Sequence, residues 1–454
     1  MNFDVVVIGG GSAGYAAANK AESKGAKVAI VDKGPLGGLC ILRGCMPTKT
    51  ILRSSDILAL ILRAKEFGLS VENPSADLQS INERKNRLIN EFADYRIEQL
   101  NHPRFTLINE NASFLSQHEL KVGQNIIKAK SFIIATGSTI AEFSIPGLTE
   151  SGFLTSDDVL ELSEIPDSMV VLGAGPVAVE LAQFFCRIGT LTTLIQRSNH
   201  ILSKGDVDLA RAIESKFREE GMILYTGANL LRVKSSGDSR TVFFSHEGCE
   251  KFVTSQIILQ ALGRKPNIDG LNLSAALVKT NKGRIEVDRD MRTNVPHIYA
   301  VGDVNGLHEI VHIAIEQGEI AAHNATQKDT RKFDERLKTS ITFTDPPVAS
   351  VGLSEKECKA QSISYLTASY PFSDHGKSLC MGETYGHVKL LCTPRNGEII
   401  GAHIVGPEAS ELIHQMTTLM HYRGTVHDIL KIPHYHPTLS EIFTYPAEKL
   451  AESL

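Results

Sequence analysis

The fold of the first part of this chain follows from one stretch, residues 5–14, Val-Val-Val-Ile-Gly-Gly-Gly-Ser-Ala-Gly. The continuous apolar run is typical of a strand in a parallel sheet covered on both faces. An alanine-rich helix is expected from Tyr15 to Lys24, and a second apolar strand, from Lys27 to Val31, ends in Asp32. Strand, Gly-x-Gly-x-x-Gly turn, helix, strand and acid together predict a Rossmann dinucleotide-binding unit.

Each residue of this fingerprint has a physical role. Gly9 allows the tight turn, Gly11 lets the backbone approach a pyrophosphate, and Gly14 permits close packing of helix on strand. The N-terminus of the helix offers N–H groups to the phosphates. Asp32, 23 residues after Gly9, is expected to accept hydrogen bonds from a ribose hydroxyl.

The same unit recurs at residues 170–178, Val-Val-Leu-Gly-Ala-Gly-Pro-Val-Ala. Gly173 and Gly175 open the second turn, and Ala178 replaces the third glycine, which the motif tolerates. Two dinucleotide-binding units in one chain require two dinucleotides. We therefore expect FAD in the first unit, because two cysteines that could form a redox disulfide, Cys40 and Cys45, lie within it and a flavin can pass the electrons of a hydride to a disulfide. The nicotinamide nucleotide is then expected in the second unit.

The second unit lacks the acid that ends the second strand of the first. Gln196 takes its place and Arg197 follows. A carboxylate there would repel a 2′-phosphate, whereas a neutral residue followed by a guanidinium group would accept it. This favours NADP(H) over NAD(H); the alternative is that Arg197 is a solvated surface arginine.

A cysteine pair lies in residues 37–49, Gly-Gly-Leu-Cys-Ile-Leu-Arg-Gly-Cys-Met-Pro-Thr-Lys. In a regular helix, Cys40 and Cys45 would be separated by a rise of about 7.5 Å, beyond the roughly 4.4–6.8 Å Cα separation of a disulfide. A bridge therefore needs a broken backbone, for which Gly44 and Pro47 are suitable. A strained bridge is easily reduced, which predicts a redox pair. The alternatives are two ordinary buried thiols or a zinc site, although no second Cys/His pair with ligand spacing lies nearby.

Composition narrows the class of protein. The chain has 454 residues, a formal net charge of −5 and seven cysteines, which together indicate about three domains and no secreted disulfide scaffold. The acidic balance argues against nucleic acid or anionic membrane as a partner. No apolar run is long enough to span a membrane, and no signal peptide precedes the first strand. We expect a cytoplasmic protein.

Motifs along nearly the whole chain resemble the pyridine nucleotide–disulfide oxidoreductases, which include dihydrolipoyl dehydrogenase, glutathione reductase and mercuric reductase. Besides the two Rossmann units, the resemblance rests on residues 135–137, 262–267, 298–303, 343–346, 350–353 and 434–441. It implies an α/β fold with two Rossmann-like domains, for FAD and NAD(P), and a C-terminal α+β interface domain for dimerisation. The implied segments are FAD-binding (1–145), NAD(P)-binding (146–270), FAD-binding again (271–335) and interface (336–454).

The resemblance also implies site residues. Cys40 would be the outer thiol that attacks the substrate, and Cys45 the thiolate against the flavin. Lys49 would lie beside the flavin ring, paired with Glu180, and Asp303 would bond the ribityl chain. Without the family, Glu180 would read as a surface acid. The expected cofactor-binding residues are Gly9, Gly11, Ser12, Gly14, Asp32, Lys33, Gly38, Lys49, Thr136, Gly137, Gly173, Gly175, Glu180, Arg197, Gly263, Arg264, Gly302 and Asp303. No metal site is expected.

His436 and Glu441 complete the expected catalytic set. Dithiol–disulfide exchange must deprotonate an incoming thiol and protonate a leaving thiolate. Histidine titrates in the right range, and a carboxylate five residues on would hold its other ring nitrogen. In the family this histidine belongs to the partner subunit, which implies a homodimer with a shared active site.

Departures from the family pattern leave the substrate open. Arg43 places a positive charge between the two cysteines, which would favour an anionic substrate or lower a thiol pKa, unless it is simply solvated. The C-terminal residues 447–454 carry no vicinal cysteines to hand over mercury. The first interpretation is a dihydrolipoyl-dehydrogenase-like enzyme that passes electrons between NAD(P)H and a small dithiol or disulfide. The alternatives are an NADPH-dependent reductase of another small disulfide or a metal ion, with a second unit like that of glutathione and mercuric reductases, and a catalytically lapsed FAD-binding protein.

Overall fold

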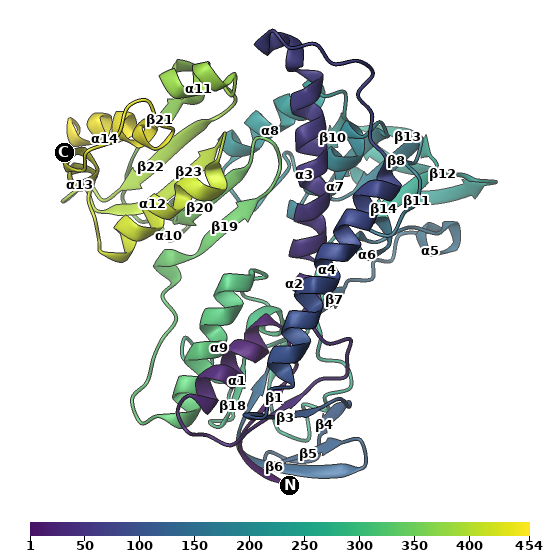
Figure 1. Cartoon of the computed structure of the whole chain (residues 1–454), viewed down its shortest axis with the longest axis vertical. Helices are drawn as coiled ribbons and strands as arrows, with labels where there is room; N and C mark the ends of the chain where they lie inside the picture. Colours follow the sequence, from purple (N-terminus) through teal and green to yellow (C-terminus); the bar gives the residue numbers. More distant parts are fainter. The chain divides into compact units, whose positions relative to one another are not determined.

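A computed structural model describes all residues from Met1 to Leu454 and confirms a mixed α/β fold (Figure 1). The chain forms two compact units, each built from three segments. Unit 1 comprises Met1–Thr50, Asn82–Glu142 and Gly263–Phe333, and unit 2 comprises Ile51–Ile81, Phe143–Leu262 and Asp334–Leu454. This division differs from the four expected segments, whose boundaries stay predictions.

Unit 1 is built on a seven-stranded sheet in the order β3-β2-β1-β6-β5-β4, with β18 paired to β6. Its strands are β1 (Asn2–Ile8), β2 (Val28–Val31), β3 (Phe105–Ile108), β4 (Ala112–Phe114), β5 (Glu119–Val122), β6 (Asn125–Ile134) and β18 (Ile298–Ala300). The strands β3, β2, β1, β6 and β18 are parallel. Val5 to Ile8 are buried, as their apolar run predicts for a sheet covered on both faces.

Small residues let two helices of unit 1 pack closely. α1 (Ser12–Glu22) lies against α9 (Val311–Thr326). A Cβ at Gly318 would lie 2.3 Å from the carbonyl oxygen of Ala13, so only glycine fits there. α1 begins three residues before the expected start because its N-cap is Gly11.

The second Rossmann sheet lies in unit 2, in the order β10-β9-β8-β14, with all its strands parallel. The strands are β8 (Ser168–Leu172), β9 (Leu191–Gln196), β10 (Ile223–Thr226) and β14 (Ile257–Gln260). α7 (Pro176–Arg187) follows β8. α8 (Val207–Glu219) is a charged helix with Asp206 and Glu220 as its caps. Beside it in sequence, β11 (Asn229–Ser236), β12 (Ser239–His246) and β13 (Cys249–Ser255) form an antiparallel sheet.

The C-terminal part of unit 2 contains an antiparallel sheet in the order β19-β20-β23-β22-β21. Its strands are β19 (Thr339–Thr342), β20 (Val348–Gly352), β21 (Leu366–Pro371), β22 (His387–Cys392) and β23 (Ile399–Val405). The main helices here are α12 (Ala409–His421), α13 (Val426–Lys431) and α14 (Thr444–Ala451), and they share one apolar core with the sheet. This part matches the expected α+β arrangement of the interface domain.

The remaining elements are short or connect the two units in sequence. The helices are α2 (Gly38–Leu42), α3 (Cys45–Leu62), α4 (Leu78–Leu100), α5 (Leu148–Ser151), α6 (Ser156–Val159), α10 (Glu355–Gln361) and α11 (Gly376–Met381). The 3₁₀ turns are η1 (Ala64–Phe67), η2 (Gly302–Asn305), η3 (Glu335–Leu337), η4 (Phe372–Asp374) and η5 (Ser440–Phe443). The strand pairs are β7 (Ser138–Ile140) with β15 (Arg264–Pro266), and β16 (Thr280–Asn281) with β17 (Arg284–Ile285).

Among the helices of this structure, we find none whose length and apolar character would suit it to crossing a membrane.

Candidate active site

The first glycine turn has the geometry expected of a pyrophosphate cradle. Gly9 has a φ of +103°, and a Cβ there would lie 2.4 Å from the carbonyl oxygen of Ala135. A Cβ at Gly14 would lie 1.8 Å from the carbonyl oxygen of Gly9, so the helix packs directly on the turn. No side chain caps the N-terminus of α1 at Gly11. The N–H groups of this turn therefore fit an anionic group such as the pyrophosphate of FAD.

Asp32 closes the same turn. Its carboxylate accepts hydrogen bonds from the backbone N–H of Gly10 at 2.5 Å and of Gly34 at 2.7 Å. These bonds fix the carboxylate at the end of β2. Each oxygen keeps a second lone pair with which it can accept a ribose hydroxyl, which stays a prediction.

Gly38 explains how the cysteine segment approaches this turn. A Cβ at Gly38 would lie 2.7 Å from the Cα of Gly11, so α2 begins in direct backbone contact with the glycine loop. Two other expected cofactor residues border the loop: Ser12 is half-buried at the start of α1, and Lys33 is exposed just after Asp32.

The second glycine turn repeats this geometry in unit 2. Gly173 has a φ of +102°, and a Cβ there would lie 2.5 Å from the carbonyl oxygen of Ala261. Gly175 is the N-cap of α7, without a side-chain cap, and a Cβ there would meet no atom within 4 Å. Arg197 is exposed, one residue beyond the end of β9. The open surroundings of Gly175 leave the backbone of this turn accessible, as the approach of a pyrophosphate requires.

Asp303 is held by a side chain that the sequence analysis missed. The Ser138 hydroxyl donates to Asp303 Oδ2 at 2.7 Å, and Arg264 Nε donates to the Ser138 oxygen at 2.8 Å. Ser138 directly follows Ala-Thr-Gly137, so its place beside that motif was the available signal. This relay orients the Asp303 carboxylate.

Two of the motifs on which the resemblance rests, residues 135–137 and 262–267, contact each other in unit 1. Thr136 Oγ1 donates to the carbonyl oxygen of Asn267 at 2.7 Å, and Asn267 Nδ2 donates to the carbonyl oxygen of Thr136 at 3.1 Å. Gly137 and Gly263 both have positive φ, at +70° and +142°. The Gly302 N–H donates to the buried Gln317 Oε1 at 2.8 Å. Backbone and side-chain bonds thus join three distant segments at this edge of the sheet.

The helix breaks between the two cysteines, as expected. α2 ends at Leu42 and α3 begins at Cys45, with Arg43 at a φ of −142°. A Cβ at Gly44 would lie 3.1 Å from the carbonyl oxygen of Leu39 and 3.3 Å from the Cα of Cys40. Glycine therefore allows the tight approach of the two segments.

Pro47 is consistent with the expected break, because Arg43, at the break, lies four residues before it, and a proline cannot form the i to i−4 hydrogen bond of a continuous helix. Pro47 lies in the first turn of α3, where a backbone N–H has no partner within the helix and proline is tolerated.

The structure brings the side chains of Cys40 and Cys45 into hydrogen-bond contact. The side-chain hydrogen bond with Cys45 and burial raise the pKa of Cys40, and the charge of Lys49 acts in the opposite direction. Both thiols are half-buried, and Arg43 is exposed. The disulfide itself stays a prediction.

Glu441 contacts two histidines in unit 2. His436 Nδ1 lies 3.1 Å from Glu441 Oε2, and His436 is 78% exposed. His375 Nε2 lies 3.6 Å from Glu441 Oε1, and its side chain is fully buried. Burial lowers the pKa of His375. No spacing in the sequence links His375 to residues 434–441, so its place beside Glu441 could not be predicted.

Glu180 is buried on α7 in unit 2, where its Oε1 accepts the backbone N–H of Phe343 at 2.8 Å. Lys49 is half-buried in the second turn of α3. The pairing of Lys49 with Glu180 stays a prediction.

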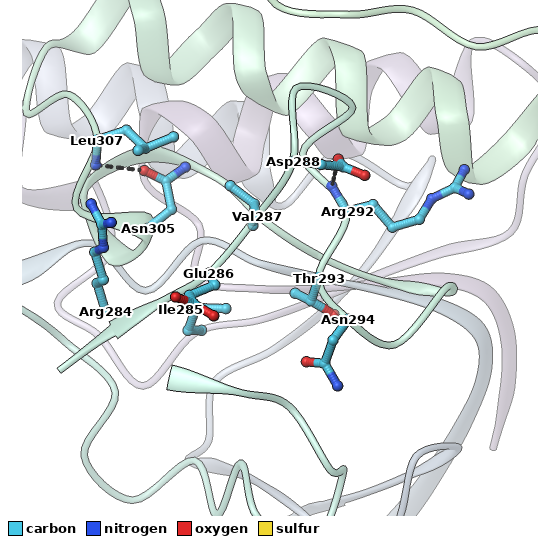
Figure 2. Close-up of a pocket in the computed structure, with 10 residues that line it drawn as sticks. All are labelled: Arg284, Ile285, Glu286, Val287, Asp288, Arg292, Thr293, Asn294, Asn305 and Leu307. Atoms are coloured by element: carbon cyan, nitrogen blue, oxygen red, sulfur yellow. Dashed lines mark hydrogen bonds between the residues drawn. The ribbon is translucent and has the colours of Figure 1, made fainter. Parts of the chain in front are cut away.

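A cavity of about 460 Å³ lies elsewhere in unit 1. Figure 2 shows its lining, in which the Leu307 N–H donates to Asn305 Oδ1 and the Arg292 N–H donates to Asp288 Oδ1. None of the expected site residues lines it. The cysteine pair as the place of the reaction stays a prediction, and this cavity adds no residue to it.

Comparison with known proteins gives two family matches along the chain. Residues 3–318 match the pyridine nucleotide-disulphide oxidoreductases, and residues 339–447 match the dimerisation domain of the same family. The chain is 36% identical over 442 residues to mercuric reductase of Staphylococcus aureus, which covers 97% of this chain and 81% of that protein. It is 34% identical over 447 residues to dihydrolipoyl dehydrogenase of Bacillus subtilis (strain 168), covering 96% and 97%.

A solved structure supports the fold. It is the Cu(II) complex of the HOCl-induced flavoprotein disulfide reductase RclA from Escherichia coli, with a TM-score of 0.87 at 24% identity over 99% of both chains.

Two glycine turns with uncapped helices, a contacting cysteine pair and a separate α+β region define a flavoprotein disulfide oxidoreductase. The chain belongs to the pyridine nucleotide-disulphide oxidoreductase family. The predictions of enzyme class, of FAD and a pyridine nucleotide as cofactors, and of a dimerisation domain are thereby confirmed.

Proposed function

We propose that the chain passes two electrons between NADP(H) and a small disulfide or dithiol, as a dihydrolipoyl-dehydrogenase-like enzyme. The contact between Cys40 and Cys45 across the helix break carries this proposal. Gly44 lets α2 and the start of α3 approach each other closely. We therefore propose that the pair closes to a disulfide without a rearrangement of the rest of the fold.

In the reducing direction, NADPH and one proton supply the electrons that open the Cys40–Cys45 bridge. FAD, when bound by the first glycine turn, supplies the two-electron chemistry that links nicotinamide and sulfur. Cys40 then attacks one sulfur of the substrate; a Cys40–substrate bond forms, the substrate S–S bond breaks, and one thiol leaves with a proton. Cys45 attacks Cys40, the bridge re-forms, and the second thiol is released. The balance is NADPH, H⁺ and one disulfide to NADP⁺ and two thiols.

His436 is proposed to move the protons of these steps for the partner subunit. Glu441 at Nδ1 favours the tautomer with the proton on Nδ1, so Nε2 presents a lone pair. The exposure of His436 and the match to a dimerisation domain support a site shared between subunits.

NADP(H) is proposed as the nicotinamide cofactor, because exposed Arg197 follows Gln196 where the first unit carries Asp32. A reducing, cytoplasmic setting is also proposed, because the other five cysteines are scattered in the sequence without a pairing pattern.

The mercuric reductase relative supports a second candidate, reduction of a soft metal ion held by the same two thiols. A turnover screen with NADPH separates the candidates. We expect oxidation of NADPH with lipoamide or another small disulfide, and turnover with Hg(II) alone would favour the second candidate.

The experiment for the redox pair is a thiol count on the oxidised and NADPH-reduced protein, with Cys40→Ser and Cys45→Ser. We expect two additional thiols after reduction and loss of turnover in both variants. Cys249→Ser is the control, since Cys249 is exposed on β13. Full turnover in Cys45→Ser would contradict the proposal.

A further inference from the structure

Two arginines of unit 1 converge on Tyr15. The guanidinium carbon of Arg96, on α4, lies 4.4 Å from the centre of the Tyr15 ring. Arg104 Nη2 donates to the Tyr15 hydroxyl at 3.1 Å. Tyr15 lies on α1, directly after the glycine turn. The two positive charges are therefore gathered around one aromatic side chain.

Several N–H groups of these arginines have no acceptor. Arg96 Nε, Arg96 Nη1 and Arg104 Nε are all buried without a hydrogen-bond partner. Burying a charged donor without an acceptor destabilises a protein substantially, so such groups are satisfied by ordered water or by a ligand. Three orphaned donors in one cluster indicate a place for an anion.

No carboxylate is among the groups that influence the charge of Arg96. Burial lowers the pKa of Arg96, and the groups that oppose this effect are Tyr15, Cys40 and Tyr95. All three are neutral at neutral pH in their ordinary state. The Tyr15 N–H donates to the carbonyl oxygen of Gly11 at 2.8 Å, and a Cβ at Gly38, two residues before Cys40, would lie 2.7 Å from the Cα of Gly11. Tyr15 is therefore one helical turn from the point where the cysteine segment meets α1.

We propose that Arg96 and Arg104 bind an anionic group, such as a carboxylate, on a disulfide substrate that reacts at Cys40. The enzyme would then prefer anionic small disulfides to neutral ones. Guanidinium groups suit this role because they present several N–H donors and keep their charge when buried. The assignment of Cys40 as the attacking thiol rests on the proposed function.

The test uses two reactive disulfides and needs no turnover. Dithiobis(nitrobenzoate) carries carboxylates, and dithiodipyridine is neutral. In the Cys45→Ser variant, Cys40 attacks either reagent, one S–S bond is exchanged for a mixed disulfide, and one coloured thiolate leaves. Mass spectrometry of peptides gives the rate at Cys40, and the exposed Cys249 and Cys380 serve as internal references.

We expect the ratio of anionic to neutral reagent rates to be at least about tenfold higher at Cys40 than at the exposed cysteines. Arg96→Gln should lower this ratio about tenfold. Arg87→Gln, an exposed arginine on the same helix, should leave it unchanged. Added salt should lower the ratio in the parent protein, because it screens the attraction.

An equal ratio at Cys40 and at the exposed cysteines would overturn the proposal, as would an unchanged ratio in Arg96→Gln. Loss of FAD from Arg96→Gln with the ratio unchanged would assign the arginine to the cofactor instead. If Arg96→Gln does not fold, Arg104→Gln provides the same comparison. Failure of NADPH-dependent turnover would contradict the proposed function alone, since these reagents react stoichiometrically.

Discussion

Glu441 Oε2 lies 3.1 Å from Nδ1 of His436, and this contact determines which nitrogen of the ring can exchange a proton. A carboxylate at Nδ1 favours the tautomer in which that nitrogen donates, which leaves the lone pair on Nε2. The other oxygen of Glu441 accepts the backbone N–H of Thr438 at 3.3 Å. The carboxylate is thus fixed on the same short segment as the histidine.

The first prediction concerns this pair. Glu441→Gln should lower kcat roughly tenfold or more, because the amide no longer stabilises the protonated ring, and His436→Gln should lower it by about 10²-fold or more. Turnover with a small disulfide and NADPH measures both. Glu448→Gln changes an exposed acid on α14 and should leave kcat unchanged. Equal rates in Glu441→Gln and the parent would contradict the role of the carboxylate.

The second prediction concerns His375. Burial lowers its pKa below the ordinary value of 6.5, so the folded protein resists protonation that the unfolded chain accepts. The unfolded state therefore binds more protons below about pH 6.5, and the stability from the neutral ring is lost as pH falls through that range. We expect the Tm of the parent to fall more between about pH 7.5 and about pH 5.5 than that of His375→Gln.

The same experiment needs a reference, because the fully buried His403 also has a pKa lowered by burial. His403→Gln should show its own reduced pH dependence, and the two effects should add if the sites are independent. An identical Tm difference in His375→Gln and the parent would show that His375 does not titrate with folding.

The third prediction separates folding from nucleotide binding. A Cβ at Gly175 meets no atom of the chain within 4 Å, so Gly175→Ala should fold and keep FAD. The added methyl group would occupy the space into which the pyrophosphate must come, which raises KM for NADPH. Gly14→Ala should instead disturb the fold, since its Cβ would lie 1.8 Å from a carbonyl oxygen. An unchanged KM in Gly175→Ala would remove the second glycine turn from the nucleotide site.

Structural features that depend on residues close together in the sequence could be predicted. The glycine turns, the strands that precede them and the helix break at Gly44 depend on residues a few positions apart, and the structure has them where the pattern indicates. Pro47 agrees with this local pattern, because proline prevents a continuous helix through the preceding turn but is tolerated in the first turn of the helix that follows.

Contacts between distant segments could not be predicted. Ser138 and Asp303 are 165 residues apart, and their hydrogen bond exists only because β7 and η2 meet at one edge of the sheet. His375 follows η4 and Arg96 lies on α4, and neither residue belongs to a sequence motif. Each gains its neighbours only from the packing of its own element within its own unit. For such residues the deciding information is the fold, which single-residue patterns do not carry.

The fourth prediction concerns an ion cluster in unit 2. The side chain of Arg187 is 4% exposed and contacts three carboxylates: Asp56 at 2.8 Å, Glu220 at 2.5 Å and Asp345 at 2.6 Å. Arg187→Met should lower the free energy of unfolding by about 3–5 kcal/mol, because it leaves the carboxylates without their cation. Arg218→Met, which removes an exposed arginine 3.8 Å from Glu214, should change it by less than about 1 kcal/mol. Denaturant unfolding measures both.

The fifth prediction uses Asp56 in the same cluster. Burial raises its pKa from 3.8 to about 6, in spite of the charge of Arg187. The folded protein therefore binds a proton between about pH 6 and about pH 4 that the unfolded chain does not, so this group makes the protein more stable as pH falls through 6. We expect this gain to be absent in Asp56→Asn, which should still fold because Arg187 keeps Glu220 and Asp345. If Asp56→Asn and the parent show the same pH dependence of unfolding, Asp56 titrates normally and the cluster is more hydrated than its burial implies.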